Sequence, residues 1–160
     1  MDKYKKNGFE GFLTIGELQK NSNIIPKSIG IYYILNLKKG SPKFLKIGTG
    51  GFFKDKNPNV NIAELEKNWV ENSEIVYIGK AGSFDGNATL NSRLRQYLNF
   101  GLEKKVGHWG GRYIWQIENS QDLIVCWKIA DKIEPREMEK EHIKNYKIEN
   151  GKRPFANLTD

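Results

Sequence analysis

The chain has 160 residues, close to the size of one domain, and is long enough to bury a core without disulfide or metal staples. Lysine and arginine total 26 against 19 aspartate and glutamate, so the net charge is +7. This excess favours a polyanionic partner, most often nucleic acid, although lysines that only keep a protein in solution give the same balance. The aromatic content of 12% excludes a disordered basic tail.

The cysteine and the N-terminus bear on the cellular compartment. Cys126 is the single cysteine, so it forms no intramolecular disulfide, and within the apolar run 123–127 it is most simply a small core residue. Residues 1–6 lack the apolar segment of a secretion signal, and no run approaches the ~18 apolar residues of a membrane span. We therefore expect a soluble, intracellular, cytoplasmic protein with no membrane partner.

Helices are predicted by apolar residues at helical spacing and by characteristic residues at the helix ends. Thr14 and Glu17 form a capping box at the start of the first helix. Gly101 stands where a C-terminal cap belongs, and Pro135 and Gly151 bound the last helix. The predicted helices are residues 14–20, 62–72, 89–99 and 135–150.

Strands are predicted where β-branched and aromatic residues gather beside glycine. The first strand is expected to form a hairpin with the second across a turn at residues 38–42. The last two are expected to form an antiparallel pair, joined by a turn at residues 118–122. The predicted strands are residues 29–37, 44–47, 75–78, 112–117 and 123–129.

The remaining segments are predicted as irregular structure. Residues 1–11 are polar and expected to be mobile, the tail 153–158 is expected to be extended, and glycine-rich loops are expected over residues 48–61, 79–86 and 107–112. No repeat or linker divides the chain. We therefore expect a single domain, residues 1–160, of the α/β class (α+β type), with a small, mostly antiparallel central sheet flanked by helices.

Candidate phosphate chemistry begins on two strands and one helix. We expect strands 29–37 and 75–78 to lie side by side and to present Tyr32, Tyr77 and Lys80 on one surface. Arg93 and Tyr97 are four residues apart and share a helical face, from which Arg93 offers a fork of donors to phosphate oxygens. The alternative, a solvated cation, describes most helix arginines.

A carboxylate on the last helix is the candidate ligand for a cation. Glu139 falls on one side of the helix with Ile143 and Tyr146, so it can reach an interior pocket and hold a hard cation there. The alternative is a solvated acidic face paired with Lys140 and Lys144. Nothing internal to the sequence selects Glu139 over its neighbouring glutamates.

Other chemistries lack their residues. Cys126, His108 and His142 have no zinc-ligand spacing, and no Ser-His-Asp or Cys-His arrangement is present. The glycines of residues 80–86 and 107–111 do not form a phosphate-binding loop of the nucleotide type. A nucleotide-hydrolysing enzyme and a nucleotide cofactor are therefore not expected.

Five motifs in order resemble one nuclease family. Gly30-Ile31-Tyr32 followed by Tyr77-Ile78-Gly79 resembles the two-strand signature for which the GIY-YIG endonucleases are named. The resemblance covers residues 29–158. Its further stretches are Lys80-Ala81-Gly82, the helix with Arg93 and Tyr97, the metal-binding type of helix with Glu139 ahead of Ile143-Lys144, and Phe155-Ala156-Asn157.

The resemblance implies an activity and a cofactor. It implies a GIY-YIG nuclease-like fold, with residues 1–28 as an N-terminal extension and residues 38–74 as an insertion between the two motif strands. It also implies a metal-dependent DNA endonuclease, a phosphodiester hydrolase with a single Mg²⁺ (Mn²⁺ substituting) that leaves a 5′ phosphate. Double-stranded DNA would be the partner, and a double-strand cut would need an oligomer or two nicks.

The resemblance also implies residue roles. Glu139 would bind the metal and Arg93 the scissile phosphate, while Tyr32, with Tyr77 as alternate, would activate or position water. A tyrosine with a pKa near 10 is a poor base, so Lys80 or the metal would have to lower that pKa or share the proton. The implied catalytic residues are Tyr32, Tyr77, Lys80, Arg93, Tyr97, Glu139 and Asn157.

A cluster after the arginine helix is the candidate DNA-binding surface: Lys104, Lys105, His108, Trp109 and Arg112. Trp109 between glycines can stack on a base or wedge into a groove, and a loop tryptophan that caps the core is the alternative. His108 is expected to make contacts only. The competing function is a catalytically inactive nucleic-acid-binding module, and restriction, repair and mobile-element roles stay open, with a slight preference for restriction.

Overall fold

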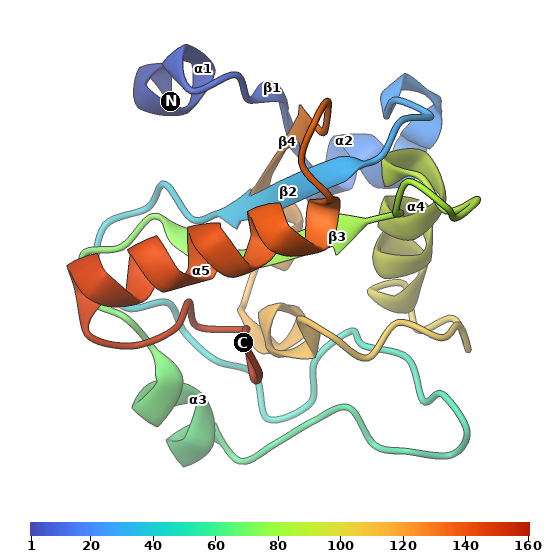
Figure 1. The fold of residues 1–160 in the computed structure, drawn as a ribbon. Helices are drawn as coiled ribbons and strands as arrows, with labels where there is room; N and C mark the ends of the chain where they lie inside the picture. The colour runs from blue at the N-terminus through green and yellow to red at the C-terminus, as the bar shows by residue number, and fades with distance from the viewer.

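A four-stranded antiparallel sheet lies at the centre of the computed structural model, which describes residues 1–160 (Figure 1). Its strands run in the order β1-β4-β2-β3. They are β1 (Glu10–Thr14), β2 (Gly30–Leu35), β3 (Ile75–Ala81) and β4 (Ile124–Ile129). The fold is therefore of the α+β type, with β2 inside the sheet and β3 at one edge.

Five α-helices and three short 3₁₀ helices surround this sheet. The α-helices are α1 (Asp2–Lys6), α2 (Ile15–Lys20), α3 (Ile62–Asn68), α4 (Leu90–Phe100) and α5 (Pro135–Asn150). The 3₁₀ helices are η1 (Ser22–Ile24), η2 (Arg112–Gln116) and η3 (Ser120–Asp122). No helix has the length and apolar character needed to cross a membrane.

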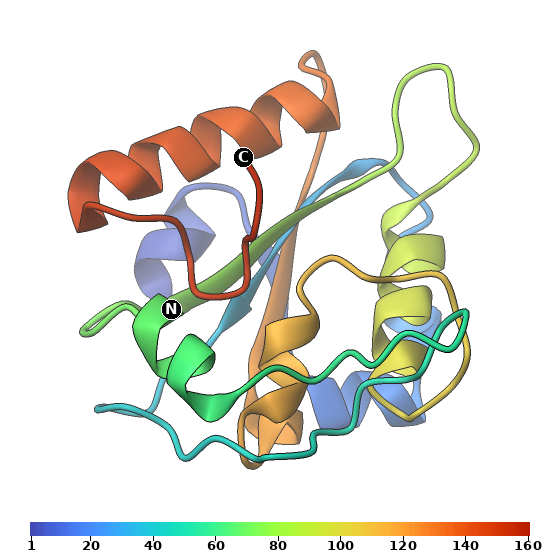
Figure 2. The same cartoon turned by 90° about the horizontal axis from the view of Figure 1, so that it is seen from below.

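Both faces of the sheet are covered, which explains why every residue of β2 is buried. Successive side chains of a strand point to opposite faces. Tyr32 and Ile34 belong to the larger core with α2, α4 and η2, whereas Ile31 and Tyr33 belong to the smaller core with α1 and α5. Figure 2 shows α5 and α4 on either side of β3. The edge strand β3 therefore separates the two helices.

The capping signals predicted from sequence are confirmed. The Thr14 hydroxyl accepts from the Glu17 backbone N–H at 3.0 Å, and the Glu17 carboxylate accepts from the Thr14 N–H at 2.7 Å. Pro135 opens α5, and Gly151 ends it in the left-handed region at φ 76°. Gly101 is the C-cap of α4 but has φ −71°, so it does not act through a left-handed conformation. Helix α3 ends earlier than predicted.

The expectation that residues 1–11 are mobile is wrong. They form α1 and the start of β1, which pairs with β4. Tyr4 and Phe9 are buried and pack against Tyr33, with ring centroids 6.1 and 4.4 Å away. The Tyr4 hydroxyl also donates to Glu74 at 2.9 Å. These two aromatic side chains fix the N-terminal segment to the sheet.

Two predicted strands are also wrong. Residues 44–47 do not form a hairpin with β2, whose neighbours are β3 and β4, and Phe44 makes only an isolated bridge to Ile117. Residues 112–116 form η2 instead of a strand. Gln116 is the physical reason: its buried side-chain amide donates to the carbonyls of Leu45 and Val60 and accepts from the Val60 N–H. The Gln116 side chain therefore joins the two segments together with the backbone hydrogen bonds from the Leu45 N–H to the Gln116 carbonyl and from the Glu118 N–H to the Lys43 carbonyl.

Two boundaries near the candidate site differ from prediction. Strand β3 continues to Ala81, so Gly79 and Lys80 lie in the strand and the turn begins at Gly82, with φ 76°. The C-terminal tail is not fully extended, because it turns at Phe155, and the Asn157 N–H donates to the Pro154 carbonyl at 3.0 Å. Both shifts change where site residues point.

Candidate active site

Three tyrosines converge on one face of the sheet. Strands β2 and β3 pair as predicted, with Tyr32 opposite Gly79. The Tyr32 and Tyr77 ring centroids are 6.0 Å apart, and Tyr97 of α4 lies 6.3 and 5.6 Å from them. A Cβ on Gly79 would lie 2.4 Å from Cζ of Tyr32, so the Tyr32 ring crosses β3 only because this position is glycine.

Lys80 lies on the other face, which corrects the expectation of one shared surface. Ile78 belongs to the core on the α5 side, and Tyr77 and Ala81 belong to the tyrosine side. By strand alternation Lys80 therefore points to the α5 side. Its positive charge acts on the carboxyl group of Glu139 rather than on the tyrosines.

Arg93 and Glu139 reach the same strand edge from opposite faces. Arg93 belongs to α4 and Glu139 to α5, yet the charges of both act on the pKa of Tyr32 and of Tyr77. Neither residue forms an ion pair. Arg93 instead donates to the Gln96 side chain at 2.6 Å. The guanidinium is thus held by a neutral group. We call Tyr32, Tyr77, Tyr97, Arg93 and Glu139 the β3-edge site.

Glu139 and Asn157 are neighbours along the outer edge of β3. The Lys80 backbone lies close enough to the Glu139 carboxyl group to lower its pKa. Two residues earlier the Asn157 side chain accepts from the Ile78 N–H at 2.9 Å and donates to the Ile78 carbonyl at 2.8 Å. Two residues of a strand span about 7 Å. Asn157 is therefore next to the β3-edge site, with its amide fully used in holding the tail to the strand.

Burial sets the protonation of the site. It raises the pKa of Glu139, against the lowering effect of the Lys80 and Arg136 charges. It raises the pKa of Tyr77 to about 12, with the charge of Glu139 adding to the effect, and it raises the pKa of Tyr32 further still. Both tyrosines are therefore protonated near neutral pH. The two hydroxyls are coupled, and burial opposes the ionisation of both.

Tyr97 and His108 form a buried pair behind the tyrosine cluster. The Tyr97 hydroxyl donates to the Gly111 carbonyl at 2.7 Å, and the His108 ring lies 4.5 Å from the Tyr97 ring. His108 is 4% exposed, its Nδ1 has no hydrogen-bond partner, and burial lowers its pKa to about 3. His108 is thus neutral and enclosed, and not on the surface where a DNA contact was expected.

The other candidate DNA-binding residues differ in their exposure to solvent. Lys104 and Lys105 are exposed. Trp109 is half-buried and packs edge-on against Phe100 at 6.3 Å, while the Arg112 guanidinium lies over its ring at 4.6 Å. The capping alternative for Trp109 therefore describes its packing, and Arg112 at the start of η2 stacks on it as a partly buried cation.

Sequence reasoning missed the basic residues around Glu139 and Asn157. Arg136 stands three residues before Glu139, a spacing that places both on neighbouring positions of one helical face. Lys147, Lys152 and Arg153 gather near Asn157, and they come from α5 and the tail. The position of Arg136 beside Glu139 could have been predicted from the helical spacing. The basic residues near Asn157 could not, because their gathering depends on the turn of the C-terminal tail.

The donor set for a metal ion is small. No group of three histidine, cysteine or acidic residues is gathered anywhere in the structure. Glu139 is the carboxylate of the β3-edge site. Magnesium commonly takes one or two carboxylates and completes its shell with water and substrate phosphates. The residues therefore fit a Mg²⁺ ion that a bound phosphate helps to hold.

Comparisons with protein-family models, curated proteins and solved structures find no match for this chain. Function is therefore argued from the geometry and charge of the β3-edge site.

Proposed function

We propose that the protein is a metal-dependent DNA endonuclease of the GIY-YIG type. The observation that carries the proposal is that Arg93 on α4 and Glu139 on α5, two helices on opposite faces of the sheet, both act by their charge on the buried pair Tyr32 and Tyr77. An unpaired arginine, a carboxylate and a hydroxyl at one strand edge are the groups that phosphodiester hydrolysis requires. The order of the five sequence motifs supports the same reading, in which residues 38–74 are an insertion.

Arg93 is assigned to the scissile phosphate. Its guanidinium is held by Gln96 and lacks a carboxylate partner, so a phosphate oxygen can take that place. The phosphorane-like transition state gathers negative charge on these oxygens, and a fixed cation there stabilises it. The net charge of +7 favours the approach of the DNA.

Tyr77 is assigned to water positioning, with Tyr32 behind it. Both hydroxyls are protonated, so they orient a water molecule by hydrogen bonding and do not remove its proton at neutral pH. Attack of this water on phosphorus releases its proton to solvent and breaks the bond to the 3′ oxygen, which takes up a proton from solvent, so the products are a 5′ phosphate and a 3′ hydroxyl.

Glu139 is assigned to metal binding. When bound, Mg²⁺ would supply Lewis-acid stabilisation of the phosphate and of the leaving oxygen. Glu139 must be deprotonated for this role, and its raised pKa means that the site loses its carboxylate at a higher pH than an ordinary glutamate would. Lys80 and Arg136 oppose that loss.

A nucleic-acid-binding module without turnover is the second candidate. The high pKa of both tyrosines and the single carboxylate favour it, because no residue of the β3-edge site is a ready base. The nuclease and the binding module would use the same basic surface to bind DNA, and only the nuclease would cleave it.

Plasmid cleavage separates the two candidates. The purified protein is incubated with supercoiled DNA in Mg²⁺, in Mn²⁺ and in excess chelator, and binding is measured on the same DNA. The nuclease proposal predicts nicked or linear product in both metals and none with chelator. Binding without product in either metal supports the module, and cleavage in excess chelator refutes the metal site.

A further inference from the structure

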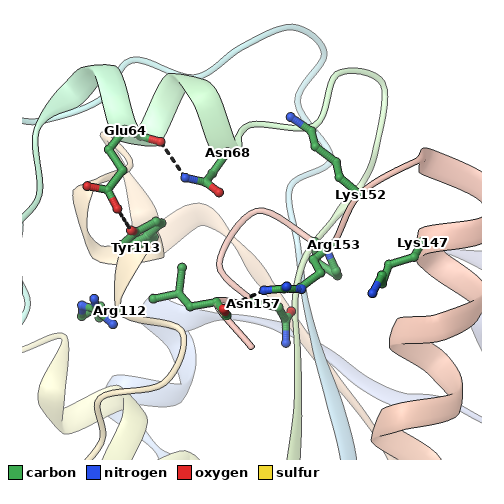
Figure 3. A pocket seen from close by; sticks show the side chains of 10 residues that line it. Glu64, Asn68, Arg112, Tyr113, Lys147, Lys152, Arg153 and Asn157 are labelled. Carbon is green, nitrogen blue, oxygen red and sulfur yellow. Dashed lines mark hydrogen bonds between the residues drawn. The ribbon is translucent and has the colours of Figure 1, made fainter. Parts of the chain in front are cut away.

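A basic cleft opens beside the β3-edge site. It has a volume of about 580 Å³, and Figure 3 shows the side chains around it. Its walls come from three segments that are far apart in the chain: α3, η2, and the stretch from the end of α5 into the C-terminal tail. Four of its lining residues are basic and one is acidic: Arg112, Lys147, Lys152 and Arg153 against Glu64.

The acidic residue does not neutralise the cations. The Glu64 carboxylate accepts a hydrogen bond from the Tyr113 hydroxyl and has no ion pair (Figure 3). Arg112 has no ion pair either, and its Nε is buried without a hydrogen-bond partner. Its guanidinium is instead oriented by the rings of Trp109 and Tyr113, at 4.6 and 5.3 Å. Arg112 is partly buried and makes no direct ion pair, although the charge of Glu64 acts on it, so its guanidinium can still take an anionic ligand.

Arg153 forms the opposite side of the cleft and is fixed in place. Its Nη1 donates to the Leu158 carbonyl at 2.6 Å, and its Nε pairs with Asp160 at 2.8 Å. Asp160 also pairs with Lys147 at 3.0 Å. These ion pairs are solvent-exposed and contribute little, about 0–1 kcal/mol each. A phosphate can therefore compete with Asp160 for both cations.

The cleft and the β3-edge site share β3. Asn157 lines the cleft and binds Ile78, two residues before the Lys80 backbone that lies close to Glu139. On the other side, Arg112 follows Gly111, whose carbonyl holds the Tyr97 hydroxyl. A strand of nucleic acid that lies along the outer edge of β3 would pass from the β3-edge site to the basic cleft.

We infer that the basic cleft binds a backbone phosphate of the DNA strand that flanks the scissile bond, with Arg112 and Arg153 as its ligands. This inference rests on the proposed function for the position of the scissile bond. It gives α3 of the 38–74 segment a role, since α3 supplies one wall of the cleft. Two opposed guanidinium groups suit the paired oxygens of a phosphate.

DNA binding without cleavage tests the cleft separately from catalysis. Anisotropy of a labelled duplex is titrated in chelator at several salt concentrations, for wild type, Arg112→Gln, Arg153→Gln and the control Lys6→Gln. Lys6 is an exposed, unpaired cation on α1, away from the cleft. Each cleft variant should bind about 3- to 30-fold more weakly, with a log–log salt slope smaller by about 1, as expected for one lost phosphate contact. Lys6→Gln should match wild type.

Two further measurements exclude misfolding and free phosphate. Arg112→Lys keeps the charge and should restore the salt slope of wild type but only part of the affinity, because a lysine lacks the stacked, two-pronged guanidinium. Thermal melts check that each variant is folded. Wild-type affinity and slope in both glutamine variants would overturn the inference. So would saturable binding of inorganic phosphate that leaves duplex affinity unchanged. A protein that binds through the cleft but never cuts DNA would refute the nuclease alone.

Discussion

The residues of the β3-edge site differ most from expectation in their protonation. Sequence alone gives a tyrosine its ordinary pKa, because burial is not visible in it. In the structure Tyr32 and Tyr77 are buried, and their pKa values rise. The motifs identified the residues, but the environment that sets their chemistry required the fold.

The pH dependence of cleavage tests the protonated tyrosines. Since the pKa of Tyr77 is raised to about 12, no group of the tyrosine cluster completes its deprotonation near neutral pH. Because neither tyrosine removes the proton of the attacking water, that proton has to pass to solvent hydroxide, and the single-turnover rate should rise about tenfold per pH unit between pH 7 and 9. The profile is measured on an oligonucleotide duplex with Tyr77→Phe in parallel, which should cut more slowly throughout. A wild-type plateau near neutral pH would point to a base with an ordinary pKa.

His108 gives a stability prediction. The unfolded residue binds a proton below about pH 6.5, whereas the folded one does so only below about pH 3. Between these values the unfolded state binds more protons, so stability falls as the pH falls, by up to about 1.4 kcal/mol per pH unit. His108→Phe should show a shallower fall in urea unfolding between pH 6.5 and 4. Equal slopes of the free energy of unfolding against pH in wild type and His108→Phe would contradict this prediction. The variant His142→Phe measures the contribution of the second histidine to the same slope.

At the scale of elements, the sequence predicted what is encoded locally. Apolar period and capping residues located α2, α4 and α5, because these signals act within a few residues. Side chains alternate between the two faces along a strand, so Lys80 and Tyr77 lie on different faces of the sheet. The sequence did not predict this, because the strand was expected to end at Ile78. The hairpin with residues 44–47 failed for a different reason: its true partner near Ile117 lies in a distant segment held by Gln116.

The C-terminal tail makes a testable contact with β3. Asn157→Ala removes two hydrogen bonds to the Ile78 backbone and leaves an edge strand unpaired there, which should cost about 1–3 kcal/mol in urea unfolding. Hydrogen exchange of the Ile78 amide should accelerate. Asn145→Ala, an exposed asparagine of α5, is the control and should change stability by less than about 0.5 kcal/mol. An unchanged exchange rate of the Ile78 amide in Asn157→Ala would show that the two hydrogen bonds from the Asn157 side chain do not protect this strand.

At the scale of the whole molecule, the β3-edge site exists only because the sheet separates α4 from α5. On its own helix, Arg93 has the same pattern as a solvated arginine. Glu139 cannot be told apart from the neighbouring glutamates of its helix. The fold places both so that their charges act on the same pair of tyrosines, which neither helix shows alone. The basic cleft was not predictable, since its walls come from three distant segments and no local pattern marks it.

Single-turnover cleavage of a DNA duplex in Mg²⁺ by two matched pairs of variants tests the central claim most directly. Glu139→Gln and Arg93→Gln alter the β3-edge site, whereas Glu141→Gln and Arg95→Gln alter exposed residues of the same two helices. The first pair should lose about 10²–10³-fold or more in rate with folding intact by thermal melt, and the second pair should cut like wild type. Wild-type rates in folded Glu139→Gln and Arg93→Gln would contradict the account.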